Sequence, residues 1–222
     1  LLAARGRLAA DPGDPGAAVE LRRGLALARA NLEFEPLLEA PLPEGWPEAT
    51  PVDRIELRSY PAYRAAWVDS EGGRPIPENR MFMTLFRHIQ KQKIAMTAPV
   101  EMGYGPRPGN KARSMAFLYR HVGQGRPGAD GAVEVVDAPE AVVASLGLRG
   151  VLDEARLADA RARLERWLQA QEGRYEKAGE IRVLGYNSPF VPWSRRYHEI
   201  QLPVRPAAGA DGQERAITRS AR

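Results

Sequence analysis

The sequence has no cysteine, which excludes disulfide bonds, thiolate metal sites and cysteine nucleophiles. It also lacks any run approaching the roughly 20 consecutive apolar residues of a membrane-spanning helix, so we expect no transmembrane helix. Basic tracts with interleaved aromatic residues are missing too, although the formal net charge is +4. The positive charge is spread among acidic residues, which indicates a solvated surface and no nucleic-acid partner.

Familiar catalytic motifs are missing as well: there is no nucleophile elbow, no zinc-type His/Glu spacing and no Gly-rich phosphate loop. Glu101 and Glu199 lie on predicted strands near proline breaks. A groove carboxylate of this kind is the acid or base that a hydrolase would use. The composition therefore favours a binding protein over an enzyme, with a weak hydrolase as an open alternative.

The length of 222 residues, 44% of them apolar, suffices for one good core. Residues 1–50 are expected to form an appendage, with a helix over 17–32 followed by a Pro-rich linker. Residues 51–205 would form the main domain. Residues 206–222 have little apolar content and are expected to be disordered. The chain does not begin with Met, so the compartment, cytoplasmic or exported, stays open. The sequence does not indicate the oligomeric state either.

Within the main domain, hydrophobic periodicity predicts strands and helices in a recurring order. Residues 52–59 and 62–69 alternate as a hairpin, and the segment 78–92 repeats apolar residues at helical spacing. The strand KIAMTAPVEM (93–102) follows, with Pro99 as a break inside it, and then a strand around 114–121.

The second half repeats this order, with a predicted hairpin over 131–150, a helix over 153–171 and two strands around a proline-containing turn. Glu56 precedes Pro61 by five positions, as Glu134 precedes Pro139. These matches predict a duplicated unit of strand-strand-helix-strand-strand. The fold class is therefore α+β.

Several segments resemble one family. IAMTAPV (94–100) resembles the "K-I-x-M-T-x-P-V" signature of the SOUL heme-binding proteins. IELRSYPAYRAA resembles the opening strands of that family, LGYNSPFVP its late turn and RYHEIQLPV its final strand. The resemblance covers about residues 51 to 204.

The resemblance implies a distorted β-barrel of two pseudo-symmetric halves with helices packed outside. It also implies a non-catalytic carrier or buffer that binds heme or a related tetrapyrrole. The ligand would lie in an apolar groove beside the first domain helix, near the loop before the last strand. A small-molecule-binding module or a weak hydrolase that uses the same groove is the alternative.

The sequence departs from the family at the proposed axial iron ligand, where Ser59 replaces a histidine. A serine hydroxyl is not an ordinary heme ligand. His88 on the first helix and His198 on the last strand are the remaining candidates for the iron. Each has the alternative of being a partly buried structural histidine.

The other candidate cofactor-binding residues come from the first helix and the late turn. The first helix supplies Met81 and Leu85 beside His88. The late turn carries apolar residues outside any periodic element, which suggests a use in packing or binding. An arginine that follows such an apolar wall suits the propionates of a porphyrin. The residues of this turn that we expect to contact the ligand are Phe190, Val191, Trp193 and Arg195.

Overall fold

The structure is a computed structural model that describes residues 2–70, 76–105 and 111–207. These residues form four α-helices, a 3₁₀ turn and ten strands. The helices are α1 (Leu2–Ala10), α2 (Pro15–Leu32), α3 (Glu78–Lys91) and α4 (Glu154–Gln169), and the 3₁₀ turn is η2 (Trp193–Arg195). The strands are β1 (Ile55–Tyr60), β2 (Tyr63–Asp69), β3 (Val100–Gly103), β4 (Ser114–Leu118), β5 (Gly128–Asp130), β6 (Val133–Ala138), β7 (Ala141–Arg149), β8 (Tyr175–Lys177), β9 (Arg182–Gly185) and β10 (Tyr197–Pro206).

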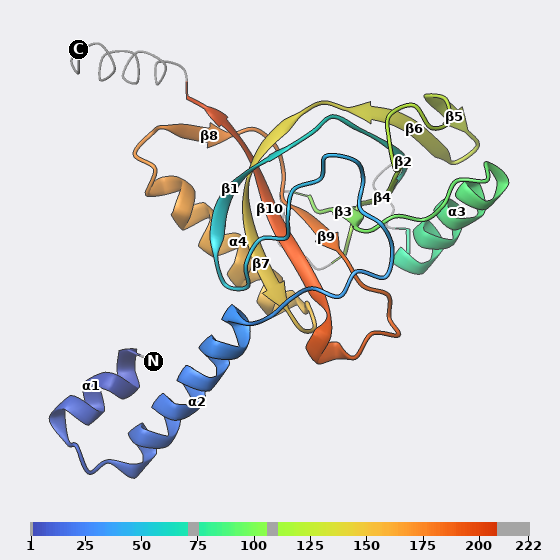
Figure 1. The fold of residues 1–222 in the computed structure, drawn as a ribbon. Coiled ribbons are helices and arrows are strands. Elements are labelled where there is room, and N and C mark those ends of the chain that lie inside the picture. Colours follow the sequence, from blue (N-terminus) through green and yellow to red (C-terminus); the bar gives the residue numbers. More distant parts are fainter. Residues whose placement is uncertain (1, 71–75, 106–110, 208–222) are drawn as a thin grey trace.

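The named strands form one antiparallel sheet in the order β1-β7-β10-β9-β3-β4-β2-β6-β5, with β8 beside β10. The sheet curls strongly (Figure 1), but its path is open among the described residues, because β1 and β5 at its two ends do not pair. The α+β class is confirmed, whereas a closed barrel is not seen.

The two predicted hairpins are wrong. β1 pairs with β7 and β2 pairs with β6, so neither consecutive pair forms a ladder of its own. Pro61 and Pro139 begin the two short connections, and a proline has no N–H to donate to a ladder. Sequence alternation fixes which residues share a face of a strand but not which strand lies alongside.

Three pairings recur in matching form in the two halves, whereas β5–β6 and β8–β10 have no counterpart among the described residues. β1–β7 corresponds to β6–β2, β7–β10 to β2–β4, and β10–β9 to β4–β3. In both halves a helix follows the second strand. The contact between β3 and β9 joins the halves at the centre of the sheet.

Both domain helices pack on one face of the sheet and enclose the larger apolar core. The helical spacing predicted for α3 is confirmed: Leu85 and Ile89 are buried in this core together with Met81, whereas Phe82 and Phe86 are only partly buried. α4 buries Leu157 and Leu164 in the same core. The sheet residues beneath the helices alternate with a second set on the opposite face, which forms a second core.

The predicted strand over 93–102 is only partly correct. β3 begins at Val100, and residues 94–99 are irregular, with a cis peptide between Ala98 and Pro99. Thr97 stabilises this irregular backbone, because its hydroxyl donates to the carbonyl oxygen of Leu118 at 2.6 Å. Proline therefore marks the start of the strand rather than a break within it.

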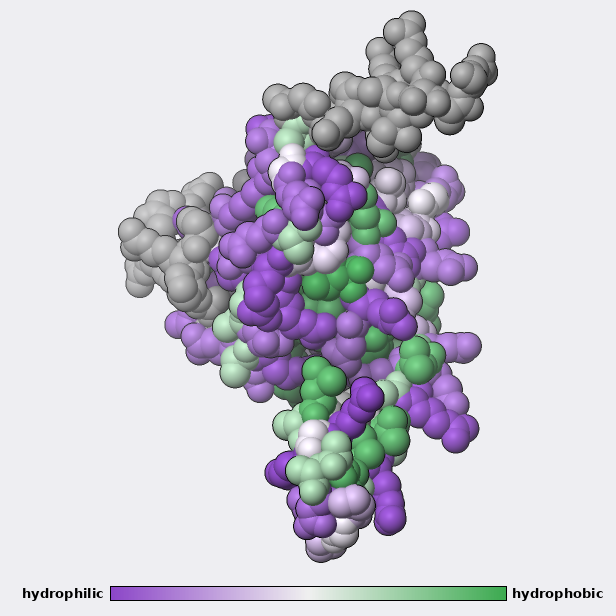
Figure 2. Space-filling model, turned by 90° about the vertical axis from the view of Figure 1, so that its left-hand side faces the viewer, coloured by the Kyte–Doolittle hydropathy of each residue, from purple (hydrophilic) through white to green (hydrophobic). Residues whose placement is uncertain are grey.

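The N-terminal region has two parts. α1, which the sequence analysis missed, pairs with α2, and the two helices project from the domain (Figures 1 and 2). Residues 34–54, the N-terminal strap, then cross the second core. Trp46 is 9% exposed and Thr50 is 1% exposed, so the Pro-rich stretch expected as a linker lies packed against the domain. Most of the predicted tail, residues 208–222, lies outside the described residues.

A substitution at Gly147 on β7 would test whether the strap packs closely against the sheet. A Cβ atom at Gly147 would lie 2.2 Å from the carbonyl oxygen of Thr50 and 2.7 Å from that of Pro51. Both are backbone atoms, so the strap would have to move away. We expect Gly147→Ala to lower the free energy of unfolding by about 3 kcal/mol in urea titrations. Gly6→Ala, where a Cβ would meet nothing within 4 Å, is the control and should not destabilise. Equal unfolding midpoints for Gly147→Ala and the parent protein would contradict this account of the strap.

Candidate functional site

The first-helix residues expected at the ligand groove face the interior. Met81 and Leu85 are fully buried in the larger core. His88 is 6% exposed. Its Nδ1 lies 2.9 Å from a carboxylate oxygen of Asp130, and its Nε2 lies 2.9 Å from the hydroxyl of Tyr119. Both ring nitrogens are therefore in use, and an iron ligand at His88 would require that one of these hydrogen bonds break.

Asp130 is the hub of this cluster. Hydrogen bonds from Lys91, and then from His88 and Gln92, lower the pKa of its carboxyl to about 2. Asp130 lies on β5, so the cluster ties the outer edge of the sheet to α3. The geometry favours a structural role for His88.

The late loop, residues 186–196 between β9 and β10, presents aromatic side chains to solvent. Phe190 is 95% exposed and Trp193 is 67% exposed. Arg195 is also exposed, whereas Val191 is buried and anchors the loop. The guanidinium of Arg196 donates to the carbonyl oxygens of Val191 at 2.9 Å and of Pro189 at 2.7 Å. An apolar surface is thus displayed on a backbone held by its own hydrogen bonds.

His198 lies just after this loop, on β10. Both of its ring nitrogens are buried, and neither has a hydrogen-bond partner among the described residues. Burial lowers the pKa of the ring to about 4, although the backbone of Gly150 acts in the opposite direction. The imidazole is therefore neutral at neutral pH, the form that binds a metal. Gly185 and Met102 lie beside it, since a Cβ at Gly185 would come 3.9 Å from the His198 ring and 3.6 Å from Met102.

Ser59, at the position of the proposed family ligand, is exposed on β1 and pairs with Val142 of β7. It lies at an edge of the sheet rather than beside α3. The geometry therefore gives Ser59 no part in a site with the other candidates.

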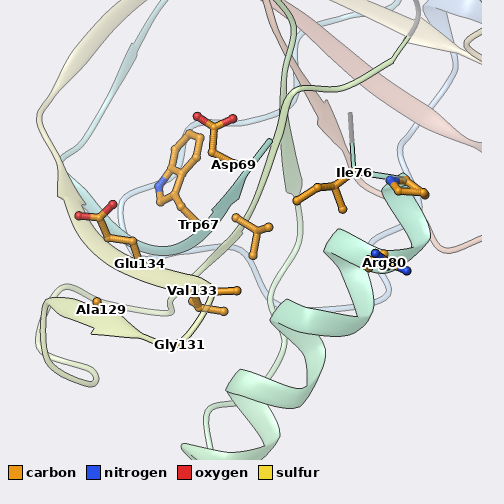
Figure 3. A pocket seen from close by; sticks show the side chains of 11 residues that line it. Trp67, Asp69, Ile76, Arg80, Ala129, Gly131, Val133 and Glu134 are labelled. Carbon is orange, nitrogen blue, oxygen red and sulfur yellow. The ribbon is translucent and has the colours of Figure 1, made fainter. Parts of the chain in front are cut away.

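A cavity of about 1100 Å³ lies between the start of α3, β2 and the β5–β6 hairpin (Figure 3). Trp67, Asp69 and Glu134 lie on one wall, and Arg80 stands on α3 across from them. The indole N–H of Trp67 is buried without a partner in the described part of the chain. Two carboxylates here would repel an anionic ligand. None of the expected site residues lines this cavity, and the sequence analysis missed it.

The two carboxylates singled out as possible acids or bases are buried under the strap. Glu199 accepts hydrogen bonds from Tyr60 at 2.8 Å, Tyr186 at 3.0 Å and the Thr50 amide at 2.7 Å. Glu101 accepts one from Tyr63 at 2.7 Å. Proximity to Glu199, after burial itself, raises the pKa of Tyr60, Tyr186 and Tyr197, so these phenols stay protonated donors.

Arg182 connects the two carboxylates. Its guanidinium lies 3.3 Å from Glu101 and donates at 2.8 Å to the side-chain oxygen of Gln201, which in turn donates at 3.0 Å to Glu199. The result is a buried polar network whose carboxylates are already satisfied by the chain itself. The tyrosines of this network were not identified from the sequence, because their common partner is visible only in three dimensions.

Comparison with known proteins now decides the family. The family model described as "SOUL heme-binding protein" matches residues 47–203. The chain belongs to the SOUL heme-binding protein family. A search of curated proteins finds no match. Within the described residues of this SOUL protein, no helix is long and apolar enough to cross a membrane.

Solved structures support the fold alone. The C-terminal domain of EcmrR is 14% identical, with a TM-score of 0.52 over 69% of this chain and 98% of that chain. EcmrR in a complex with DNA is 12% identical, with a TM-score of 0.52 over 93% of this chain and 78% of that chain. An uncharacterized conserved protein from Listeria innocua is 13% identical, with a TM-score of 0.52 over 70% of this chain and 94% of that chain.

The side chains fit a tetrapyrrole held by packing better than one ligated from α3. His88 has no free nitrogen, whereas the late loop offers exposed aromatic faces followed by Arg195. His198 is neutral and has no hydrogen-bond partner among the residues that the structure describes, but its ring nitrogens are buried. An iron ligand at His198 would require a local opening around Met102.

His198 generates a prediction on pH dependence. Its ordinary pKa of 6.5 falls to about 4 in the folded protein. As the pH drops below 6.5, His198 binds a proton in the unfolded chain but not in the folded protein. The free energy of unfolding therefore decreases towards pH 4. The difference corresponds to roughly 3 kcal/mol near pH 4. In urea titrations between about pH 7 and 4.5, we expect the free energy of unfolding of His198→Asn to fall less than that of the parent protein. The exposed His121, changed to Asn, is the control, and the same pH slope in all three proteins would refute the assignment.

Proposed function

We propose that this protein binds heme or a related tetrapyrrole against the late loop and acts as a non-catalytic carrier or buffer. The observation that carries the proposal is the exposure of Phe190 and Trp193 on a loop that is internally hydrogen-bonded. Large aromatic side chains in such positions usually mark a binding surface. The family match supports the class of ligand.

The chemistry of the loop suits the two parts of such a ligand. A planar macrocycle would cover the faces of Phe190 and Trp193, and burial contributes about 25 cal/mol for each Å² removed from water. Arg195 would pair with a propionate, for which a guanidinium offers two parallel N–H donors. Val191 would keep the loop seated, while Met81 and Leu85 would hold α3 against the sheet from within the core.

Iron coordination would be secondary to packing in this proposal. Of the two histidine candidates, His198 is preferred over His88, because its ring nitrogens make no hydrogen bond within the described part of the chain that iron binding would have to break. When bound, a heme would supply redox-active iron. The residues of this chain would bind and orient it, with no acid or base placed for catalysis on the late loop.

We further infer that residues 51–205 arose by duplication of one unit. The exchange of strand partners between the halves and the repeated position of the helix support this. In this arrangement β9 corresponds to β3 and β10 to β4, so the late loop corresponds to the β3–β4 connection and not to the segment with Pro99 that precedes β3.

The proposal is tested by titration with hemin. The purified protein should give a saturable shift of the Soret band. Trp193→Ala should weaken binding by about 1 to 3 kcal/mol through lost burial. Val122→Ala, which shortens another exposed apolar side chain, is the control and should bind as the parent protein does. A parent protein that shows no saturable shift would remove the proposed function.

His88 provides a second test. Because both ring nitrogens are held by Asp130 and Tyr119, we expect His88→Gln to leave the Soret position and the hemin affinity unchanged. The variant should lose some stability, about 1 to 3 kcal/mol, because a buried hydrogen-bond network is disturbed. A folded His88→Gln protein with lost binding or a changed axial spectrum would show that α3 supplies the iron ligand.

A further inference from the structure

We infer that the N-terminal strap completes the binding surface of the late loop, and that Glu39 is the residue that positions the two segments. The inference rests on the proposed function and extends it to residues outside the family match, which begins at residue 47. Leu37 and Leu38 would contact the ligand together with the aromatic residues of the loop.

Glu39 holds the start of the late loop with both carboxylate oxygens. One oxygen accepts a hydrogen bond from the backbone amide of Ser188 at 2.6 Å. The other accepts one from the hydroxyl of Ser188 at 2.9 Å. The same hydroxyl lies 3.3 Å from the amide of Phe190, which donates to it. The carboxylate of the strap is therefore linked through one serine to the backbone of the most exposed aromatic residue.

Asn187 forms a second tie between the segments. Its side-chain amide donates to the carbonyl oxygen of Leu37 at 2.6 Å, and its side-chain oxygen accepts from the backbone amide of Tyr197 at 2.8 Å. The strap is thus joined both to the loop and to the first residue of β10. Figure 1 shows the strap passing beside the loop that connects β9 and β10.

Both of the joined segments carry exposed apolar side chains, which we take to form one surface. Leu37 is 44% exposed and Leu38 is 46% exposed, beside a loop whose Phe190 and Trp193 are exposed still further. Four large apolar side chains on two hydrogen-bonded segments make a broader surface than the loop alone offers. A planar apolar ligand wider than one aromatic ring would need this breadth. The carboxylate of Glu39 is occupied by Ser188, which leaves the anionic edge of the ligand to Arg195.

Order in the free loop is the physical basis of the effect. A loop that is already held in its bound shape loses less conformational entropy when the ligand arrives. Removal of the Glu39 carboxylate would leave Ser188 without its partner and loosen the backbone that carries Phe190. The affinity for the ligand would then fall even though no contact atom had been deleted.

The experiment uses graded variants of the whole chain. Glu39→Ala removes both acceptors, Glu39→Gln keeps one side-chain oxygen, and Glu35→Gln changes an exposed glutamate of the same strap as the control. Hydrogen exchange at the Ser188 amide in the ligand-free protein reports on loop order, and hemin titration reports on affinity. We expect faster exchange and a dissociation constant raised about three- to tenfold in Glu39→Ala. Glu39→Gln should show a smaller effect, and Glu35→Gln none.

Direct contact is tested separately. Leu38→Ser should weaken hemin binding without faster exchange at Ser188, because it shortens a contacting side chain but leaves the ties intact. Unchanged affinity in both Glu39→Ala and Leu38→Ser, with normal binding by the parent protein, would overturn this inference and leave the proposed function standing. Failure of the parent protein to bind hemin would overturn both.

Discussion

The burial of one carboxylate governs the arrangement of the chain around the second core. Glu199 is fully buried, and an unpaired charge in such a place would cost several kcal/mol. Its donors include Thr50 of the N-terminal strap, Tyr60 of β1 and Tyr186 at the start of the late loop, and the last of these is more than 120 residues from the other two. The strap therefore belongs to the folded domain, since without the Thr50 amide the carboxylate would lose a donor. Trp46 covers the network, with its ring edge-on to those of Tyr60 and Tyr63.

The buried network also distinguishes the two faces of the sheet. The helix-covered face is apolar and depends on side-chain shape, whereas the strap-covered face combines aromatic rings with satisfied charges. Arg182 and Gln201 extend the hydrogen bonds from Glu199 to Glu101 across neighbouring strands. The buried carboxylates of this face are thus engaged by the chain itself, whereas Nη2 of Arg182 has no partner among the described residues. The exposed late loop is left as the surface on which new contacts can form.

Local pattern predicted much of the fold, but not its long-range partners. The 3.6-residue period located α3 and α4, and the helix predicted over 153–171 is close to the observed α4. The partners of β1 and β2 were wrong, because alternation carries no information on neighbours. In the site, Phe190 and Trp193 were recognised as apolar residues in a turn. The burial of His88 was not, since Asp130 and Tyr119 lie 42 and 31 residues away in the sequence.

The strap gives the projecting helices a mechanical connection to the domain. Phe34, at its start, stacks on Tyr197 at the first position of β10, and the guanidinium of Arg149 lies over the same Phe34 ring. Arg149 also donates to the carbonyl oxygen of Ala30 at the end of α2. The end of α2 is therefore connected through Arg149 and Phe34 to Tyr197, the residue directly after the late loop. A change in the orientation of α2 would reach the late loop through these contacts.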